Sequence, residues 1–278
     1  MTRIFDYAFK PLFLVCGASG IVLIALWLAF LNSLLPGFKP AIAPVYWHAH
    51  EMLLGFVGAA IGGFLLTAVA NWTKRPPIQG YPLGLIVLAW LLGRIAMAYG
   101  TTMPMILLTV TNSLYWLLLT ALIGREIVLA GNHRNLVVVL LLLAFCATAM
   151  IFPVYPFYSA RFAIALVCLM IMLIGGRIIP AFTTNWLKLN QVPGKEPQSF
   201  NQFDRLTMIA TVPTLLAWAI APDHAITGAL LTSVAVMHFY RLSRWRGLAT
   251  AKEPLLLALH LGYAWLPLGL LLLGIATF

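Results

Sequence analysis

Long apolar segments follow one another along almost the whole chain. Each is close to the roughly 20 residues that an α-helix needs to cross the hydrocarbon core of a bilayer. Proline, glycine and charged residues separate these segments, as signals that end helices do. The predicted spans cover approximately residues 12–35, 48–70, 82–99, 103–123, 136–152, 161–179, 206–221, 225–240 and 254–277, and Pro213 interrupts the seventh. We therefore predict an all-α, polytopic transmembrane bundle of about nine spans, with residues 1–278 forming a single domain.

Composition excludes most other classes of protein. Hydrophobic residues make up 62% of the chain and charged residues only 9%, whereas a soluble domain carries about 25% charged residues. A soluble enzyme, a disordered chain or a nucleic-acid-binding domain is not compatible with these values, so the expected surroundings are lipid. The three cysteines form no C-x-x-C motif, which argues against a disulfide framework and against covalently attached haem.

The basic residues predict the orientation of the bundle. Of the 17 lysines and arginines, 13 fall at the chain ends and loops on the side of the N-terminus, and Lys39 and Arg161 fall on the opposite side. Cytoplasmic loops collect lysine and arginine. This asymmetry predicts a cytoplasmic N-terminus and, with nine spans, an external C-terminus. The longest connection is expected over approximately residues 180–205.

Titratable side chains inside spans are costly, so each is a candidate for function. His48, His50 and Glu51 lie together at the external end of the second span. A helical repeat of 3.6 residues turns His48 and His50 to different faces, which allows one of them to face a site in the bundle. Imidazole binds haem iron and copper, and Glu51 is suited to orient an imidazole or to relay protons. The competing interpretation is a polar cap on a helix end.

A second pair of histidines lies on the last two spans. His238 and His260 fall in the cytoplasmic halves of consecutive antiparallel spans, where two facing imidazoles are able to hold a haem b between them. The alternative is two unrelated histidines that make hydrogen bonds in the core.

Two arginines also lie within spans. Arg94 is deep in the third span, and Arg177 is near the cytoplasmic end of the sixth. A guanidinium binds carboxylates in a bidentate fashion, so we expect Arg94 to pair with Glu51 or with a haem propionate. Arg177 is expected either to hold a propionate or to extend to the interface.

Four motifs together resemble the NnrS family of bacterial inner-membrane proteins. The resemblance covers the whole chain in order, and its motifs are WHAHEM at residues 47–52, GFLLTA at 63–68, GGR at 175–177 and LHLGYAW at 259–265. It implies a multi-pass haem and copper protein of the nitric oxide response, which binds or helps to detoxify nitric oxide or protects against nitrosative stress. It places metal ligation on His48, His50 and His260.

The chain departs from the family pattern in length. Family members typically have about twelve spans, so the resemblance implies either a short member or a truncated sequence. If the further helices carry ligands, another chain or a homo-oligomer supplies them, or the sites stay incomplete. Two other functions remain open. One is a proton- or ion-coupled transporter that uses the intramembrane histidine, glutamate and arginine residues, and the other is a membrane anchor for a partner subunit.

Overall fold

The computed structural model describes residues 3–198 and 200–278, and this part of the chain is helical without a β-strand. Nine helical stretches in it are long and apolar enough to cross a membrane, which confirms the predicted number of spans. The described chain forms two compact units, residues 1–164 and residues 165–278.

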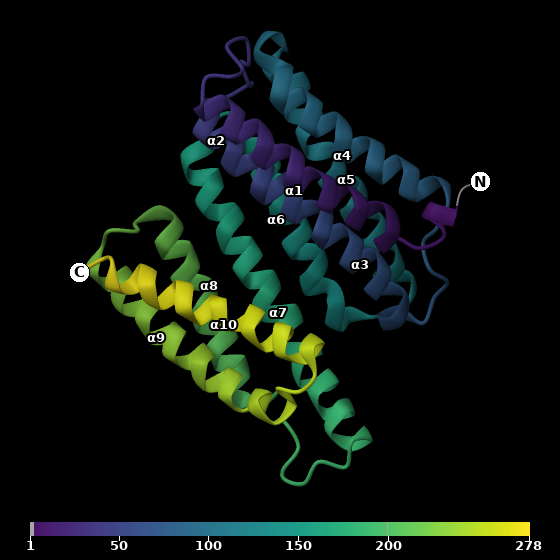
Figure 1. The fold of residues 1–278 in the computed structure, drawn as a ribbon, viewed down its shortest axis with the longest axis vertical. Coiled ribbons are helices and arrows are strands. Elements are labelled where there is room, and N and C mark those ends of the chain that lie inside the picture. Colours follow the sequence, from purple (N-terminus) through teal and green to yellow (C-terminus); the bar gives the residue numbers. More distant parts are fainter. Residues whose placement is uncertain (1–2, 199) are drawn as a thin grey trace. The chain divides into compact units, whose positions relative to one another are not determined.

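The first unit contains six helices and the beginning of a seventh (Figure 1). The helices are α1 (Phe9–Leu31), α2 (Pro44–His50), α3 (Val57–Thr73), α4 (Tyr81–Tyr99), α5 (Met105–Leu129), α6 (Leu136–Ile151) and α7 (Pro156–Leu189). Helix α3 lies against α1 and α5, and α5 also contacts α4 and α6. Pro44 at the first turn of α2 suits a helix start, because that position needs no backbone N–H donor. Buried side chains of α1, α2, α4 and α5 pack together near Trp47 and Met97.

The second unit consists of the larger part of α7 with α8 (Gln202–Ile220), α9 (Ala225–Ser243) and α10 (Pro254–Ile275). Helix α9 contacts both α8 and α10. The core of the second unit combines Met172, Trp218, Trp245 and Tyr263 with smaller apolar residues of all four helices. Helix α8 begins with a capping box, in which Asn201 and Asp204 each accept a hydrogen bond from the backbone N–H of the other.

Two prolines that the sequence predicts to be breaks lie inside helices. Helix α7 continues through Pro180 to Leu189, and α8 continues through Pro213. The connection after α7 is therefore shorter than the predicted residues 180–205. With 34 residues, α7 is about 51 Å long and exceeds the hydrocarbon thickness of roughly 30 Å. The end of this helix was predicted too early because its last turns carry the polar residues Thr183, Asn185 and Lys188 and so resemble a loop in sequence.

Candidate functional site

The WHAHEM motif continues from α2 into a π-helical turn, Glu51–Phe56, before α3 begins. A π-helical turn widens the helix locally and occurs often at functional sites. It shifts the helical register after His50. Glu51 and Gly55 are buried within it, so a carboxylate faces the interior of the first unit.

One ring nitrogen of His50 makes a hydrogen bond, and the other has no hydrogen-bond partner among the described residues. Its side chain is fully buried, and Nδ1 lies 2.8 Å from Oε1 of Glu51. Nε2 is buried and has no hydrogen-bond partner among the described residues. Because a carboxylate accepts, Nδ1–H is the donor, and the lone pair of Nε2 remains available. Metal-binding histidines in proteins are oriented in this way by a carboxylate or a carbonyl.

Arg94 forms an ion pair with Glu51, which is one of the two pairings predicted for it. Its Nε lies 3.5 Å from Oε2 of Glu51, and its Nη2 donates to Oδ1 of Asn112 over 3.4 Å. A Cβ atom at Gly55 would overlap the Arg94 guanidinium. The Trp90 indole N–H donates to the Gly55 carbonyl over 2.9 Å. The glycine therefore leaves the space in which Arg94 reaches the carboxylate.

His48 lies in a different environment from His50, in line with the predicted separation of their faces. Its ring stacks on Trp27 of α1 with centroids 4.6 Å apart, whereas the His50 ring meets Phe152 edge-on at 4.8 Å. Nδ1 of His48 is also buried without a partner among the described residues. The two histidines are thus not assembled into one ligand set.

His260 in the second unit repeats the arrangement of His50. Its Nδ1 lies 2.8 Å from the Leu256 carbonyl oxygen and donates to it. Its Nε2 is buried and has no partner within residues 3–198 and 200–278. A Cβ atom at Gly247, in the turn before α10, would lie against the imidazole ring. His260 is therefore a second buried imidazole with a bare Nε2.

His238 has no free ring nitrogen in this arrangement. Thr211 donates its hydroxyl proton to the Thr207 carbonyl over 2.7 Å, so its oxygen accepts from Nε2–H of His238 over 3.0 Å. Nδ1 then accepts from the Tyr263 hydroxyl over 2.8 Å. These contacts correspond to the alternative interpretation of His238 as a hydrogen-bonded core residue, and they argue against its predicted role as a haem ligand.

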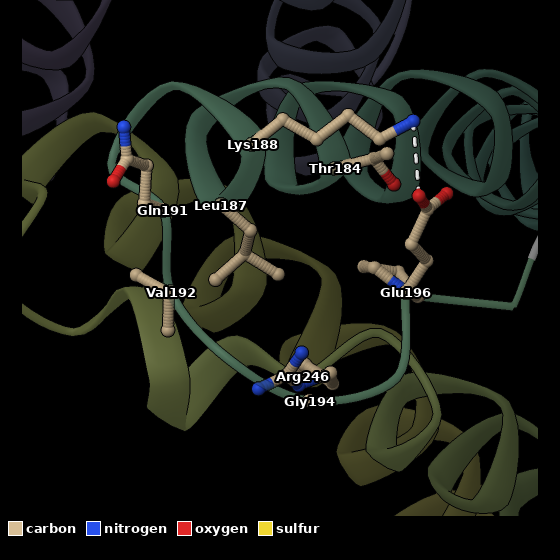
Figure 2. Close-up of a pocket in the computed structure, with 9 residues that line it drawn as sticks. Thr184, Leu187, Lys188, Gln191, Val192, Gly194, Glu196 and Arg246 are labelled. Carbon is tan, nitrogen blue, oxygen red and sulfur yellow. Dashed lines mark ion pairs between the residues drawn. The ribbon is translucent and has the colours of Figure 1, made fainter.

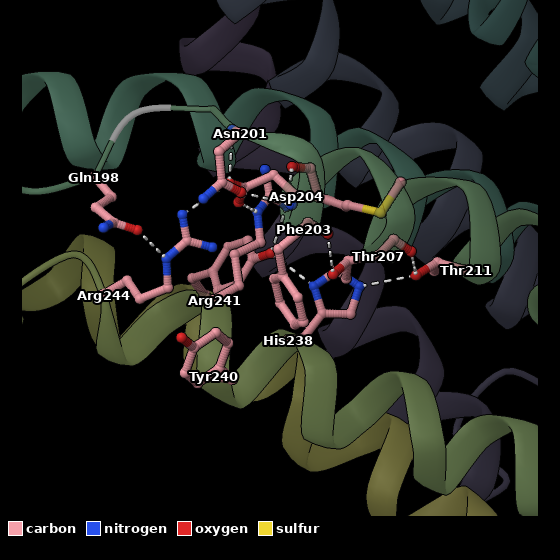
Figure 3. Close-up of polar contacts among 12 residues, drawn as sticks. Gln198, Asn201, Phe203, Asp204, Thr207, Thr211, His238, Tyr240, Arg241 and Arg244 are labelled. Atoms are coloured by element: carbon pink, nitrogen blue, oxygen red, sulfur yellow. Dashed lines mark hydrogen bonds and ion pairs between the residues drawn. The ribbon is translucent and has the colours of Figure 1, made fainter.

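Sequence reasoning missed the charged network next to His238, which Figure 3 shows. Nε of Arg241 donates to Oδ1 of Asp204 over 2.8 Å, and Nη1 of Arg241 donates to the Tyr263 hydroxyl over 3.0 Å. Arg241 is only 1% exposed, although the sequence places it just after a predicted span. The signal that was available is the glycine pair at 175 and 176, because Cβ atoms there would overlap Tyr263 and Arg241.

Arg177 follows this glycine pair on α7 and is partly buried in the second unit. His260 belongs to the same unit. The role of Arg177 in holding a propionate stays a prediction.

A cavity of about 300 Å³ lies in the second unit, where the end of α7 meets the following loop and Arg246 (Figure 2). At its edge, Lys188 and Glu196 form an exposed ion pair at 3.0 Å. Arg246 donates to the carbonyls of Pro193 and Lys195 and so fixes the loop. None of the predicted site residues lines this cavity.

The donor set fits haem better than a copper site built only from protein ligands. Within the described part of the chain, no three His, Cys, Asp or Glu side chains lie together as a metal-ion site. Haem iron needs one or two axial ligands from the protein. His50 and His260 each present a buried imidazole that is oriented by a hydrogen bond at Nδ1.

These features define a polytopic helical membrane protein with ionisable groups buried in its spans. A family model described as NnrS protein matches residues 3–278. The chain therefore belongs to the NnrS family, and this membership makes it a membrane protein of the nitric oxide response in general. Searches of the curated proteins and of the solved structures give no match.

Proposed function

We propose that this protein is a haem and copper protein of the bacterial inner membrane that binds nitric oxide or helps to detoxify it, and so protects against nitrosative stress. The observation that carries the proposal is the shared state of His50 and His260. Each has Nδ1 fixed by an acceptor and a buried Nε2 without a described partner.

In this proposal His50 and His260 would each hold a haem through Nε2. Bound haem iron would supply a coordination position for nitric oxide. Glu51 keeps the proton on Nδ1 of His50 and makes the imidazole a stronger ligand. Arg94 balances the charge of Glu51 in a place where an unpaired carboxylate would be costly, and Arg177 is proposed to hold a propionate. His48, which stacks on Trp27, remains a candidate copper ligand.

The test is an absorption spectrum with metal analysis of protein produced with ample haem. We expect a Soret band, whose intensity falls in His50→Ala and in His260→Ala. The matched control is His133→Ala, because His133 is exposed in the short 3-10 helix His133–Asn135 and its loss should leave the spectrum unchanged. A wild-type preparation with neither a Soret band nor copper contradicts the proposal.

A further inference from the structure

Three charged side chains are buried together where α8 begins and α9 ends. The exposed fractions of the Asp204, Arg241 and Arg244 side chains are 3%, 1% and 8%. Asp204 accepts from Nε of Arg241 at 2.8 Å and from Nη2 of Arg244 at 3.1 Å. Its carboxylate also accepts from the Asn201 backbone N–H, so its hydrogen-bonding capacity is largely used.

This cluster carries one positive charge more than it carries negative charge. One carboxylate faces two guanidinium groups, and a buried charge is costly unless an opposite charge pairs with it. Glu196 is already paired with Lys188, and both are well exposed. The cluster therefore lacks a counter-anion among the described side chains that contact it.

Arg244 is the member of the cluster that is free to bind a further group. Its Nε donates to Oε1 of Gln198 over 2.9 Å and its Nη2 to Asp204, but its Nη1 is buried with no partner in the described part of the chain. The rings of Phe203 and Tyr240 lie 5.7 and 5.8 Å from the guanidinium carbon (Figure 3). Tyr240 is 55% exposed, so the guanidinium lies close to the surface on the side of this ring.

The position suits the phosphate group of a lipid. The ends of membrane spans lie near the headgroup region, where basic and aromatic residues contact anionic lipids. Guanidinium forms strong, charge-assisted hydrogen bonds with phosphate, and Nη1 of Arg244 has N–H groups that no described residue accepts from. We propose that Arg244 and the surrounding cluster form a binding site for a phosphate oxyanion, independently of any haem. An anionic phospholipid and free inorganic phosphate share this chemistry.

The experiment compares thermal unfolding of the full chain in nanodiscs of phosphatidylcholine alone and in nanodiscs that also contain phosphatidylglycerol. A third sample has phosphatidylcholine with inorganic phosphate at matched ionic strength. We expect the wild-type unfolding midpoint to rise by several degrees in at least one of the two anion-containing samples. A rise only with phosphatidylglycerol assigns the site to a lipid, and a rise with phosphate assigns it to a soluble oxyanion.

The variants separate a specific site from general charge attraction. Arg244→Gln should lose the rise and Arg244→Lys should keep part of it. Arg205→Gln removes the same charge from an exposed position at the same end of α8 and should keep the rise in full. Each variant is compared with itself in neutral lipid, so that a change in its basal stability cancels. No rise in wild type, an undiminished rise in Arg244→Gln, or an equal loss in Arg205→Gln overturns the proposal.

Discussion

The buried imidazoles of His50 and His260 are each oriented by one hydrogen-bond acceptor at Nδ1. Glu51 and the Leu256 carbonyl fix the proton on Nδ1 of His50 and His260, respectively. The two acceptors differ in charge, since only Glu51 brings a negative charge that must be balanced by Arg94. An imidazole next to a carboxylate is the more basic ligand. If both imidazoles bind a metal as proposed, they should therefore differ in their affinity for it, although their local geometry is alike.

We predict that Glu51→Gln destabilises the protein strongly. The substitution leaves the Arg94 guanidinium buried without its counter-charge, and removal of one partner of a buried pair costs about 3–5 kcal/mol. The measurement is the free energy of unfolding in detergent. The matched control is Glu196→Gln, because the Lys188–Glu196 pair is more than 60% exposed on both sides and should contribute less than about 1 kcal/mol. Equal stabilities of the two variants would contradict this prediction.

For single residues, the sequence predicts which titratable side chains lie within spans better than it predicts the residues that they contact. The separation of His48 from His50 follows from helical periodicity alone. The hydrogen bonds of His238 do not, since they depend on Thr211 and Tyr263 from two other helices. The burial of Arg241 is equally hidden, because its partner Asp204 lies 37 positions away.

The elements of the second unit approach one another through the glycine pair on α7. Gly175 lies against the Tyr263 ring, and Gly176 lies against the Arg241 guanidinium. The missing side chains let Nη1 of Arg241 reach the Met172 carbonyl at 3.1 Å. A helix surface without side chains at this point is thus a condition for the buried charge network.

Gly176→Ala should therefore disrupt the contact of α7 with α9. The added methyl group overlaps Arg241, and such overpacking costs about 1–3 kcal/mol. Gly262→Ala on α10 is the control, because nothing lies within 4 Å of its added Cβ. That variant should gain up to about 1 kcal/mol from helix propensity. Thermal unfolding of both variants in one detergent tests the prediction, which fails if Gly176→Ala is as stable as Gly262→Ala.

Helix boundaries were predictable where apolar periodicity and polarity change together. The end of α6 at Ile151 and the start of α10 at Pro254 agree with the sequence to within a residue. The π-helical turn at Glu51–Phe56 was not predictable, because it arises from packing of the segment and has no sequence signal of its own. That turn contains Glu51, the buried carboxylate of the WHAHEM motif, whereas His48 and His50 lie before it in α2.

For the whole molecule, the number of spans follows from apolar length, and the structure confirms it. The division into two compact units at residue 164 has no counterpart in the hydropathy pattern, since it falls within the single long helix α7. Hydropathy reports the apolar length of each span, whereas contacts between helices determine the units.

The orientation in the membrane is the remaining prediction at this scale. The sequence predicts thirteen basic residues on the side of the N-terminus and two on the other side. Because positively charged loops stay in the cytoplasm, a fusion after Gly131 should place its reporter inside the cell and a fusion after Pro222 should place it outside. Fluorescent-protein fusions report the cytoplasm and alkaline phosphatase fusions the exterior. Phosphatase activity of the fusion at Gly131 would contradict the predicted orientation. The sides of the membrane predicted for His50 and for His260 would then be exchanged.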